Sequence, residues 1–218
     1  MSHTWADYCV FWREFRRSFH TTGAILPSGP ALAAALARYV RNGSDGSRSA
    51  RRILEVGPGT GAVTRRIVAG LGSDDRLDLV ERNAEFVACL RERITGDSEY
   101  RAAAARIRLI HSGVEELSEE EPYDVIISGL PLNNFSAELV ERILAKLHRL
   151  LAPSGTLSFF EYLAIRRVKA AVSRQAERER LQAIGRVLDE ILSKHEIGRD
   201  CVMANVPPAW VHHVRFGS

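Results

Sequence analysis

Three glycines at alternate positions, Gly57, Gly59 and Gly61, follow a short apolar strand that begins at Ile53. Alternate glycines let the backbone turn tightly and approach a ligand where a side chain would collide. A helix is expected from Ala62, and the N-terminus of that helix points into the same crevice. This pattern predicts a binding site for a nucleotide cofactor.

Two carboxylates favour one kind of cofactor over another. The spacing also fits the dinucleotide pattern G-x-G-x-x-A, and Glu81, 20 residues after Gly61, stands where an acid binds ribose in either case. Glu55, two residues before the first glycine, would repel a pyrophosphate but attract the cationic amino acid end of S-adenosylmethionine. The sequence therefore favours S-adenosylmethionine over NAD.

Composition indicates one globular domain, since 218 residues with 45% hydrophobic and 26% charged side chains can bury a substantial core. A net charge of +3 is too small to require a nucleic-acid partner. The three cysteines lie far apart without a C-x-x-C pair, which indicates a reducing compartment and predicts neither a disulfide framework nor a metal site. No apolar stretch reaches the roughly 20 residues of a spanning helix, and no signal-peptide pattern begins the sequence. We expect a cytoplasmic protein, soluble or peripheral on the inner face of the membrane.

Apolar strands alternate with helical periods, which predicts an α/β fold with a mostly parallel sheet between helices. Strands are expected at residues 53–56, 77–81, 107–110, 124–128 and 157–162, and helices at 62–71, 84–94, 136–151 and 165–194. Residues 200–206 and 210–216 are expected to form an edge pair, the last strand antiparallel. Residues 41–51, rich in Gly, Ser and Arg, are expected to link an N-terminal helical extension (1–50) flexibly to the domain at 51–218.

The glycine loop and this order of elements resemble the class I S-adenosylmethionine-dependent methyltransferases over about residues 53–216. The resemblance implies a Rossmann-like fold with a seven-stranded sheet. It also implies that the amino acid part of the cofactor lies against the glycines near Glu55, that Glu81 binds both ribose hydroxyls, and that residues 113–115 pass beside the adenine. The cofactor residues implied in this way are Glu55, Gly57, Gly59, Gly61, Glu81, Gly113, Val114, Ser128, Thr22 and Gly23.

Four shorter segments, residues 22–28, 128–131, 160–162 and 205–211, together resemble the bacterial phospholipid N-methyltransferases. Those enzymes methylate phosphatidylethanolamine toward phosphatidylcholine, and related enzymes act on ornithine lipids. The resemblance implies that the substrate is the amine headgroup of a membrane lipid and that the cofactor leaves as S-adenosylhomocysteine. The alternatives outside this class are a nicotinamide-dependent oxidoreductase and a non-catalytic membrane-binding module.

The tetrad Ser128-Gly-Leu-Pro131 is also similar to the N-x-P-aromatic motif of ribosomal RNA adenine dimethylases. An enzyme that acts on a flipped adenine needs an aromatic plane to stack on the base, but here Leu132 follows the proline. Ser128 also replaces the Asn or Asp that many amino-nitrogen methyltransferases use. An RNA methyltransferase is therefore the alternative rather than the favoured function, and a nucleic-acid partner is not expected.

Aromatic side chains follow one face of a helix expected before residue 21, with arginines on the neighbouring surfaces. The aromatic residues are Trp5, Tyr8, Phe11, Trp12, Phe15 and Phe19. Trp and Tyr favour the interface between lipid headgroups and hydrocarbon, and arginines favour an anionic surface. This segment is expected to contact an anionic membrane or to cover the domain as a lid, and one helix can do both.

A second basic segment begins directly after the fifth expected strand, at the carboxyl end of the sheet where substrates enter open α/β folds. Its cations are Arg166, Arg167, Lys169, Arg174, Arg178 and Arg180. Such a charge run is either a solvated helix face or, at this position, a binding site for a lipid phosphate.

Transfer of a methyl group to an amine is an in-line displacement in which alignment and loss of the amine proton dominate catalysis. The polar groups best placed to orient the amine are Tyr162 and Glu161 at the end of the fifth strand and Ser128 at the end of the fourth. Alternation along a strand lets only one of Glu161 and Tyr162 face the substrate, and Tyr162 is favoured. His212 and His213 could line the headgroup site.

Overall fold

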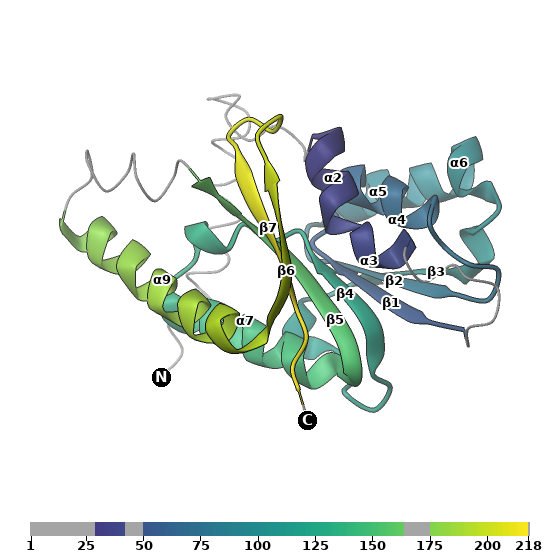
Figure 1. Cartoon of the computed structure of the whole chain (residues 1–218). Coiled ribbons are helices and arrows are strands. Elements are labelled where there is room, and N and C mark those ends of the chain that lie inside the picture. The colour runs from purple at the N-terminus through teal and green to yellow at the C-terminus, as the bar shows by residue number, and fades with distance from the viewer. Residues whose placement is uncertain (1–28, 42–49, 164–174, 218) are drawn as a thin grey trace.

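The computed structural model describes residues 29–41, 50–163 and 175–217. Within them, seven strands form one sheet in the order β3-β2-β1-β4-β5-β7-β6 (Figure 1). The strands are β1 (Arg52–Val56), β2 (Arg76–Glu81), β3 (Ile107–His111), β4 (Tyr123–Ser128), β5 (Leu151–Tyr162), β6 (Glu196–Val202) and β7 (Ala209–Val214).

The sheet is mostly parallel, because β3, β2, β1, β4 and β5 pair in parallel and only β7 runs antiparallel to its neighbours β5 and β6. The expected Rossmann-like fold with an antiparallel edge pair is therefore confirmed. The chain order reverses on the two sides of β1, since β2 and β4 flank that strand. Such a reversal opens a crevice at the carboxyl ends of the strands, which is where ligands bind in open α/β sheets.

Helices cover both faces of the sheet (Figure 1). They are α2 (Pro30–Leu36), α3 (Arg38–Arg41), α4 (Ala62–Val68), α5 (Ala84–Gly96), α6 (Ser98–Arg101), α7 (Ala137–Leu150) and α9 (Gln175–His195), with short 3-10 helices η1 (Ala104–Arg106), η2 (Val114–Glu116) and η3 (Leu132–Asn134). One core packs the face under α2 and α4, and the other packs the face under α7 and α9. Successive residues such as Ile53 and Leu54 are fully buried in opposite cores, as expected for a central parallel strand.

Three expected boundaries differ in the structure, two of them for identifiable reasons. Strand β5 begins at Leu151 rather than at residue 157, because Pro153 and Gly155, which the sequence predicts only to stop the preceding helix, lie within the strand, where the pairing with β4 shifts register. Strand β6 covers Glu196–Val202 rather than 200–206, because the chain turns at residues 203–206 before β7. Helix α4 also ends at Val68, three residues earlier than expected.

The described part of the N-terminal extension belongs to the core under α2 and α4. Leu32 and Leu36 of α2 are fully buried there. At the start of the sheet, the Arg51 side chain is ion-paired with Asp75 and donates to the Val40 carbonyl at 2.9 Å. The end of the expected flexible link is thus fixed, while residues 42–49 lie outside the described residues, and the domain division at residue 50 stays a prediction.

Among the described residues, no helix has the length and apolarity needed to cross a membrane.

Candidate active site

The loop between β1 and α4 has the backbone conformation that its glycines allow. Gly57, Gly59 and Gly61 have φ angles of 71°, 55° and 85°, which other residues rarely adopt. A Cβ atom on Gly57 would lie 2.8 Å from the Leu130 side chain, whereas one on Gly59 would meet nothing within 4 Å. The loop is therefore packed at its start and open in the middle, as a cradle for a ligand requires.

The tetrad after β4 lies directly against this loop. The Gly129 amide donates to the Val56 carbonyl at 2.8 Å, and a Cβ atom on Gly129 would lie only 2.6 Å from the Gly57 carbonyl oxygen. Only glycine fits such a close backbone approach. The two loops at the switch point of the sheet thus form one continuous surface.

Glu81 at the end of β2 is almost fully buried beside the glycine loop. Its carboxylate accepts from the Gly59 amide at 3.1 Å and from the Asn83 amide at 2.8 Å. Burial raises the pKa of Glu81, although these hydrogen bonds oppose the shift. A carboxylate oxygen can accept more than one hydrogen bond, so Glu81 can also accept from a pair of ribose hydroxyls.

Gly113 and Val114, expected beside an adenine, follow the end of β3. Glu81 pairs in register with His111, so the segment after His111 continues past the Glu81 end of β2. Val114 is buried in the core under α7, and Glu115 is ion-paired with Arg82 at 3.1 Å. The position agrees with the expected role, which stays a prediction.

Glu55 is the fully buried carboxyl of this region. Neither of its oxygens has a hydrogen-bond partner among the described residues. Burial raises the pKa of Glu55 to about 8; the nearby Thr64 hydroxyl and amide lower that pKa, and Glu81 raises it. The repulsion of a pyrophosphate, as argued from the sequence, assumed an ionised Glu55, whereas burial keeps this carboxyl largely protonated at neutral pH until a cation approaches it.

A cofactor with a cationic amino acid end fits this region, because it matches three features. These are the buried Glu55 carboxyl without a partner, the open position at Gly59, and Glu81, which stands where an acid binds ribose. Glu55 can neutralise the ammonium group, because a nearby cation lowers the pKa of a buried acid and so returns its charge. Of the three glycine positions, Gly59 is the one that leaves room for a ligand, because a Cβ atom there would meet nothing within 4 Å.

Tyr162 and Glu161 at the end of β5 point to opposite faces of the sheet, as alternation requires. Tyr162 packs edge-on against Phe160, at 5.0 Å between ring centroids, in the core under α2, and burial raises the pKa of its hydroxyl. Glu161 lies on the other face, with one oxygen 3.5 Å from His212 Nε2. Of these two residues, Glu161 is therefore the one that contacts a titratable side chain, His212.

His212 extends this contact into a chain of three titratable groups. Its Nδ1 atom lies 2.6 Å from the Glu196 carboxylate, and its ring is 3% exposed. The contact between His212 and Glu161 could not be predicted from the sequence, because it depends on the antiparallel pairing of β7 with β5. The sequence signal that bears on this contact is the alternation of side chains along a strand. Residues 210 and 212 share one face of β7, and residues 159 and 161 share one face of β5.

His213 points to the face opposite His212 and has a complete set of partners. Its two ring nitrogens lie 2.8 Å from the Ser158 hydroxyl and 3.1 Å from the Asp200 carboxylate, which is ion-paired with Arg38 at 3.0 Å. Burial lowers the pKa of His213 even though Asp200 raises it. This cluster ties β5, β7 and β6 to α3 and is a structural network.

The residues of the tetrad and Leu132 after it provide no exposed side-chain surface on which a nucleic-acid base could stack. Ser128 is fully buried, and its hydroxyl accepts from the Leu130 amide at 3.4 Å. Leu132 is 1% exposed and packs in the core under α7, so it cannot serve as a stacking surface. Arg180 of α9 donates to the carbonyls of Asn133 and Phe135, which fastens α9 to the segment after the tetrad.

The remaining residues predicted for the site lie outside the described residues. They are Thr22 and Gly23 for the cofactor, and Trp5, Tyr8, Trp12, Phe15, Arg166, Arg167, Lys169 and Arg174 for the lipid or membrane.

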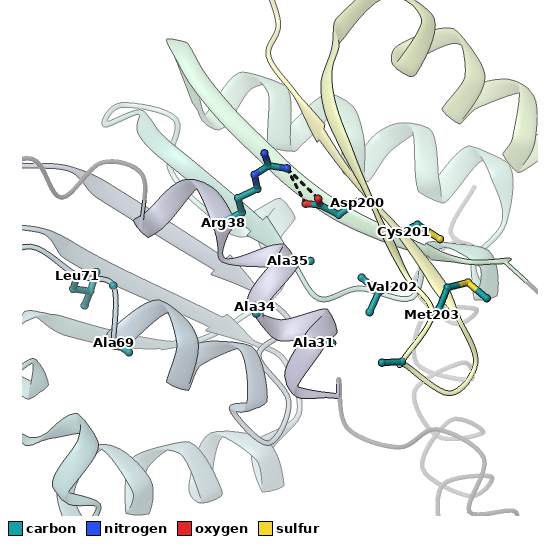
Figure 2. A pocket seen from close by; sticks show the side chains of 12 residues that line it. Ala31, Ala34, Ala35, Arg38, Ala69, Leu71, Asp200, Cys201, Val202 and Met203 are labelled. Carbon is teal, nitrogen blue, oxygen red and sulfur yellow. Dashed lines mark hydrogen bonds and ion pairs between the residues drawn. The ribbon is translucent and has the colours of Figure 1, made fainter.

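Two surface hollows lie on the α2 side of the molecule. The larger, of about 830 Å3, lies between α2, the end of α4 and β6, with alanines on one wall and the Arg38–Asp200 ion pair at its border (Figure 2). It contains none of the predicted site residues. The second, of about 760 Å3, brings Pro30 of α2 beside Thr60 and Gly61 of the glycine loop. The candidate site is therefore identified by the glycine loop, the buried acids and the tetrad, and not by the size of a hollow.

Residues 53–155 match the model of a family described as a methyltransferase domain. The chain is 28% identical over 152 residues to the ornithine lipid N-methyltransferase of Singulisphaera acidiphila, which covers 70% of this chain and 76% of that protein. It is 32% identical over 123 residues to the tRNA1(Val) (adenine(37)-N6)-methyltransferase of Dyadobacter fermentans, which covers 49% of this chain and 48% of that protein. The chain thus spans about three quarters of the first relative and about half of the second.

Among solved structures, the fold is similar to that of the O-methyltransferase from Bacillus cereus in complex with SAH. The TM-score is 0.63 at 16% sequence identity, over 95% of this chain and 91% of that chain. At this identity the similarity concerns the fold.

Proposed function

We propose that this chain is a class I S-adenosylmethionine-dependent methyltransferase that methylates the amine headgroup of a membrane lipid. The observation that carries the proposal is the similarity to an ornithine lipid N-methyltransferase over 70% of the chain. The four segments at residues 22–28, 128–131, 160–162 and 205–211 support the same substrate class, which includes phosphatidylethanolamine and its methylated forms.

S-adenosylmethionine supplies an activated methyl group on a sulfonium that brings its own leaving group. In this chain the open glycine loop would hold the cofactor, Glu55 would accept hydrogen bonds from its ammonium group and Glu81 would accept them from its ribose hydroxyls. The close contact between Gly129 and Gly57 sets the tetrad beside that position. The residues of the tetrad therefore border the place where the acceptor amine must align with the methyl group.

An alkyl ammonium has a pKa of about 10 and must lose a proton before its nitrogen can attack. We assign this proton to Glu161, because Glu161 at the carboxyl end of β5 contacts His212, and His212 contacts Glu196. The series of contacts from Glu161 through His212 to Glu196 lets the proton taken from the amine move away from the reacting nitrogen. Tyr162, favoured from the sequence, is the alternative, because its hydroxyl can accept a hydrogen bond from the amine on the opposite face of β5.

A methyltransferase that acts on RNA is the second candidate, favoured by the similarity to a tRNA adenine N6-methyltransferase over about half of the chain. Against it stands Leu132, which replaces the aromatic residue of the adenine-binding motif and is buried in the core. A flipped base would lack its stacking plane here.

The substrate class places the enzyme at a membrane surface, and the proposed contacts are the aromatic N-terminal segment and the basic segment at residues 166–180. Neither location nor membrane contact follows from the fold. Both belong to the proposal that the acceptor is a lipid.

Mass spectrometry of lipids from cells that express the protein tests the proposed function. We expect methylated amine lipids with the wild-type protein and markedly less of them with the Glu81→Ala variant, which lacks the acid proposed to bind the ribose. Lipids that are identical in both cultures, with both proteins folded and abundant, would contradict the proposal.

A further inference from the structure

The turn between β6 and β7, residues 203–208, exposes large apolar side chains. Met203 is 68% exposed and Val206 is 70% exposed, and among the described residues Ile197 is the other large hydrophobic residue on the surface, at 42%. Single exposed apolar residues are common on protein surfaces. Met203 and Val206 lie on the same short turn, and the residues around them indicate what this turn can bind.

The turn and the strand ends beside it carry no ionic charge. Residues 201–211 contain no Asp, Glu, Lys or Arg, so this tip can leave water without desolvating an ion. On the stem, Trp210 pairs in register with Cys201, and the Arg199 guanidinium lies 4.7 Å from the centroid of the Trp210 ring. An apolar tip followed by a Trp and an exposed Arg matches the order of hydrocarbon, interface and lipid phosphate in a bilayer.

The turn lies at the same edge of the sheet as the active-site loops. Strands β5 and β6 are both antiparallel to β7, so β6 ends at the carboxyl edge. Figure 1 shows the hairpin projecting beside the start of α2, and Figure 2 shows Met203 at the turn near Ala31. Pro30 of α2 in turn lines one hollow with Gly61 of the glycine loop. The turn is therefore close to the cofactor loop.

Two hydrogen bonds join the turn to the chain positions that adjoin the predicted membrane segments. The Asn205 side chain, 6% exposed, accepts from the Gly29 amide at 3.0 Å and donates to the Pro207 carbonyl at 2.8 Å. The Leu163 amide donates to the Pro208 carbonyl at 2.9 Å. Gly29 follows the N-terminal stretch that contains the aromatic segment expected before residue 21, and Leu163 precedes the basic segment at residues 166–180. Both segments are expected to contact lipid.

We propose that residues 203–208 are a membrane-docking hairpin, with Met203 and Val206 inserted into the lipid interface and Arg199 at the phosphate level. The inference rests on the proposed lipid substrate and names the part of the described fold that meets the bilayer. The hairpin holds the carboxyl edge of the sheet against the membrane, so that a headgroup can reach the cofactor loop without leaving the bilayer. Because the tip is uncharged, its contribution to binding is apolar and is insensitive to salt.

Vesicle sedimentation with the full chain tests the hairpin, using vesicles of phosphatidylethanolamine and phosphatidylglycerol. The test variant is Met203→Ser/Val206→Ser, and the matched control is Ile197→Ser, an exposed apolar residue near the other end of β6. We expect the double variant to partition at least tenfold more weakly than the wild type at both low and high salt, and the control to partition as the wild type does. The affinity for S-adenosylhomocysteine reports that all three proteins are folded.

Equal partitioning of the double variant and the wild type, or equal losses in the double variant and the control, would overturn the hairpin proposal. So would a wild-type protein that binds no vesicles. The proposed function is tested separately with wild-type protein and amine lipid dispersed in detergent micelles. A lack of methyl transfer there contradicts the lipid substrate, whereas methyl transfer in micelles together with unchanged partitioning contradicts the hairpin alone.

Discussion

The glycine-loop region and the β5–β7–β6 region both bury ionisable side chains, but they differ in whether the protein supplies the partners. Glu55 in the first region has no hydrogen-bond partner among the described residues, whereas His213 in the second lies between Ser158 and Asp200. A buried polar group without a partner is costly, and it persists where a ligand completes it. The comparison indicates that the first region is built to bind and that the His213 network is built to hold strands together.

The largest expected effect concerns Glu55 and the pH dependence of stability. The pKa of Glu55 rises from 4.5 to about 8 on folding, so the folded protein retains a proton that the unfolded chain loses between these values. Its contribution therefore lowers the free energy of unfolding as pH rises from about 4.5 to about 8, by on the order of 4 kcal/mol. Glu55→Gln should remove this decline in urea unfolding measured across that range. An exposed acid, replaced in Glu116→Gln, serves as the control and should retain the decline.

Cofactor binding should reverse the burial effect at Glu55. The ammonium group of S-adenosylhomocysteine favours the ionised carboxyl, so binding at pH 7 should release a proton. Calorimetric titration in buffers of different ionisation enthalpy measures that release. If wild type and Glu55→Gln release the same number of protons, Glu55 is not the partner of the ammonium group.

The second effect concerns Glu81, the acid of the glycine-loop region that is expected to bind the cofactor ribose. Glu81→Ala should weaken the binding of S-adenosylhomocysteine by roughly 1 to 3 kcal/mol, because charge-assisted hydrogen bonds to the ribose are lost. S-adenosylhomocysteine should raise the melting temperature of the wild-type protein, and NAD should not. Stabilisation by NAD equal to that by S-adenosylhomocysteine would contradict the assignment of this region.

The third effect asks which face of β5 meets the substrate. Glu161→Gln should lower the rate of methyl transfer at least tenfold, about 1.4 kcal/mol in the transition state, with the affinity for S-adenosylhomocysteine unchanged. Tyr162→Phe is the matched variant on the opposite face and should leave the rate nearly unaltered. The reverse result would move the role to Tyr162.

The smallest effect concerns the His213 network. Because burial lowers the pKa of His213, the unfolded chain takes up a proton first as pH falls below 6.5, and the contribution of His213 to stability is lost on the acid side. Ser158→Ala should cost about 1 kcal/mol in urea unfolding and leave the rate of methyl transfer unchanged. A large loss of activity with intact stability would show that this network belongs to the active site.

The parts of the site that a short stretch of sequence determines could be predicted. The three glycines, Glu55 and Glu81 follow two strands directly, so their place at the carboxyl edge depends only on local pattern and on the parallel order of the sheet. The protonation of Glu55 could not be predicted, because it depends on how completely α4 and the sheet bury that side chain.

Contacts that depend on long-range pairing were missed for a different physical reason. Glu161 reaches His212 only because β7 runs antiparallel beside β5, and Gly29 reaches Asn205 across 176 residues of sequence. Two short edge strands leave their register open until their neighbours are known. The start of β5 was misplaced because a strand can include a proline where its pairing is irregular.

The most direct test of the central claim is methyl transfer by the purified protein from S-adenosylmethionine with a deuterated methyl group. Separate reactions would contain vesicles of phosphatidylethanolamine, vesicles with ornithine lipid, and RNA, each analysed by mass spectrometry. We expect labelled methyl groups on the amine of a lipid and none on RNA. Label on adenine, with none on either lipid, would contradict a lipid methyltransferase and support the RNA alternative.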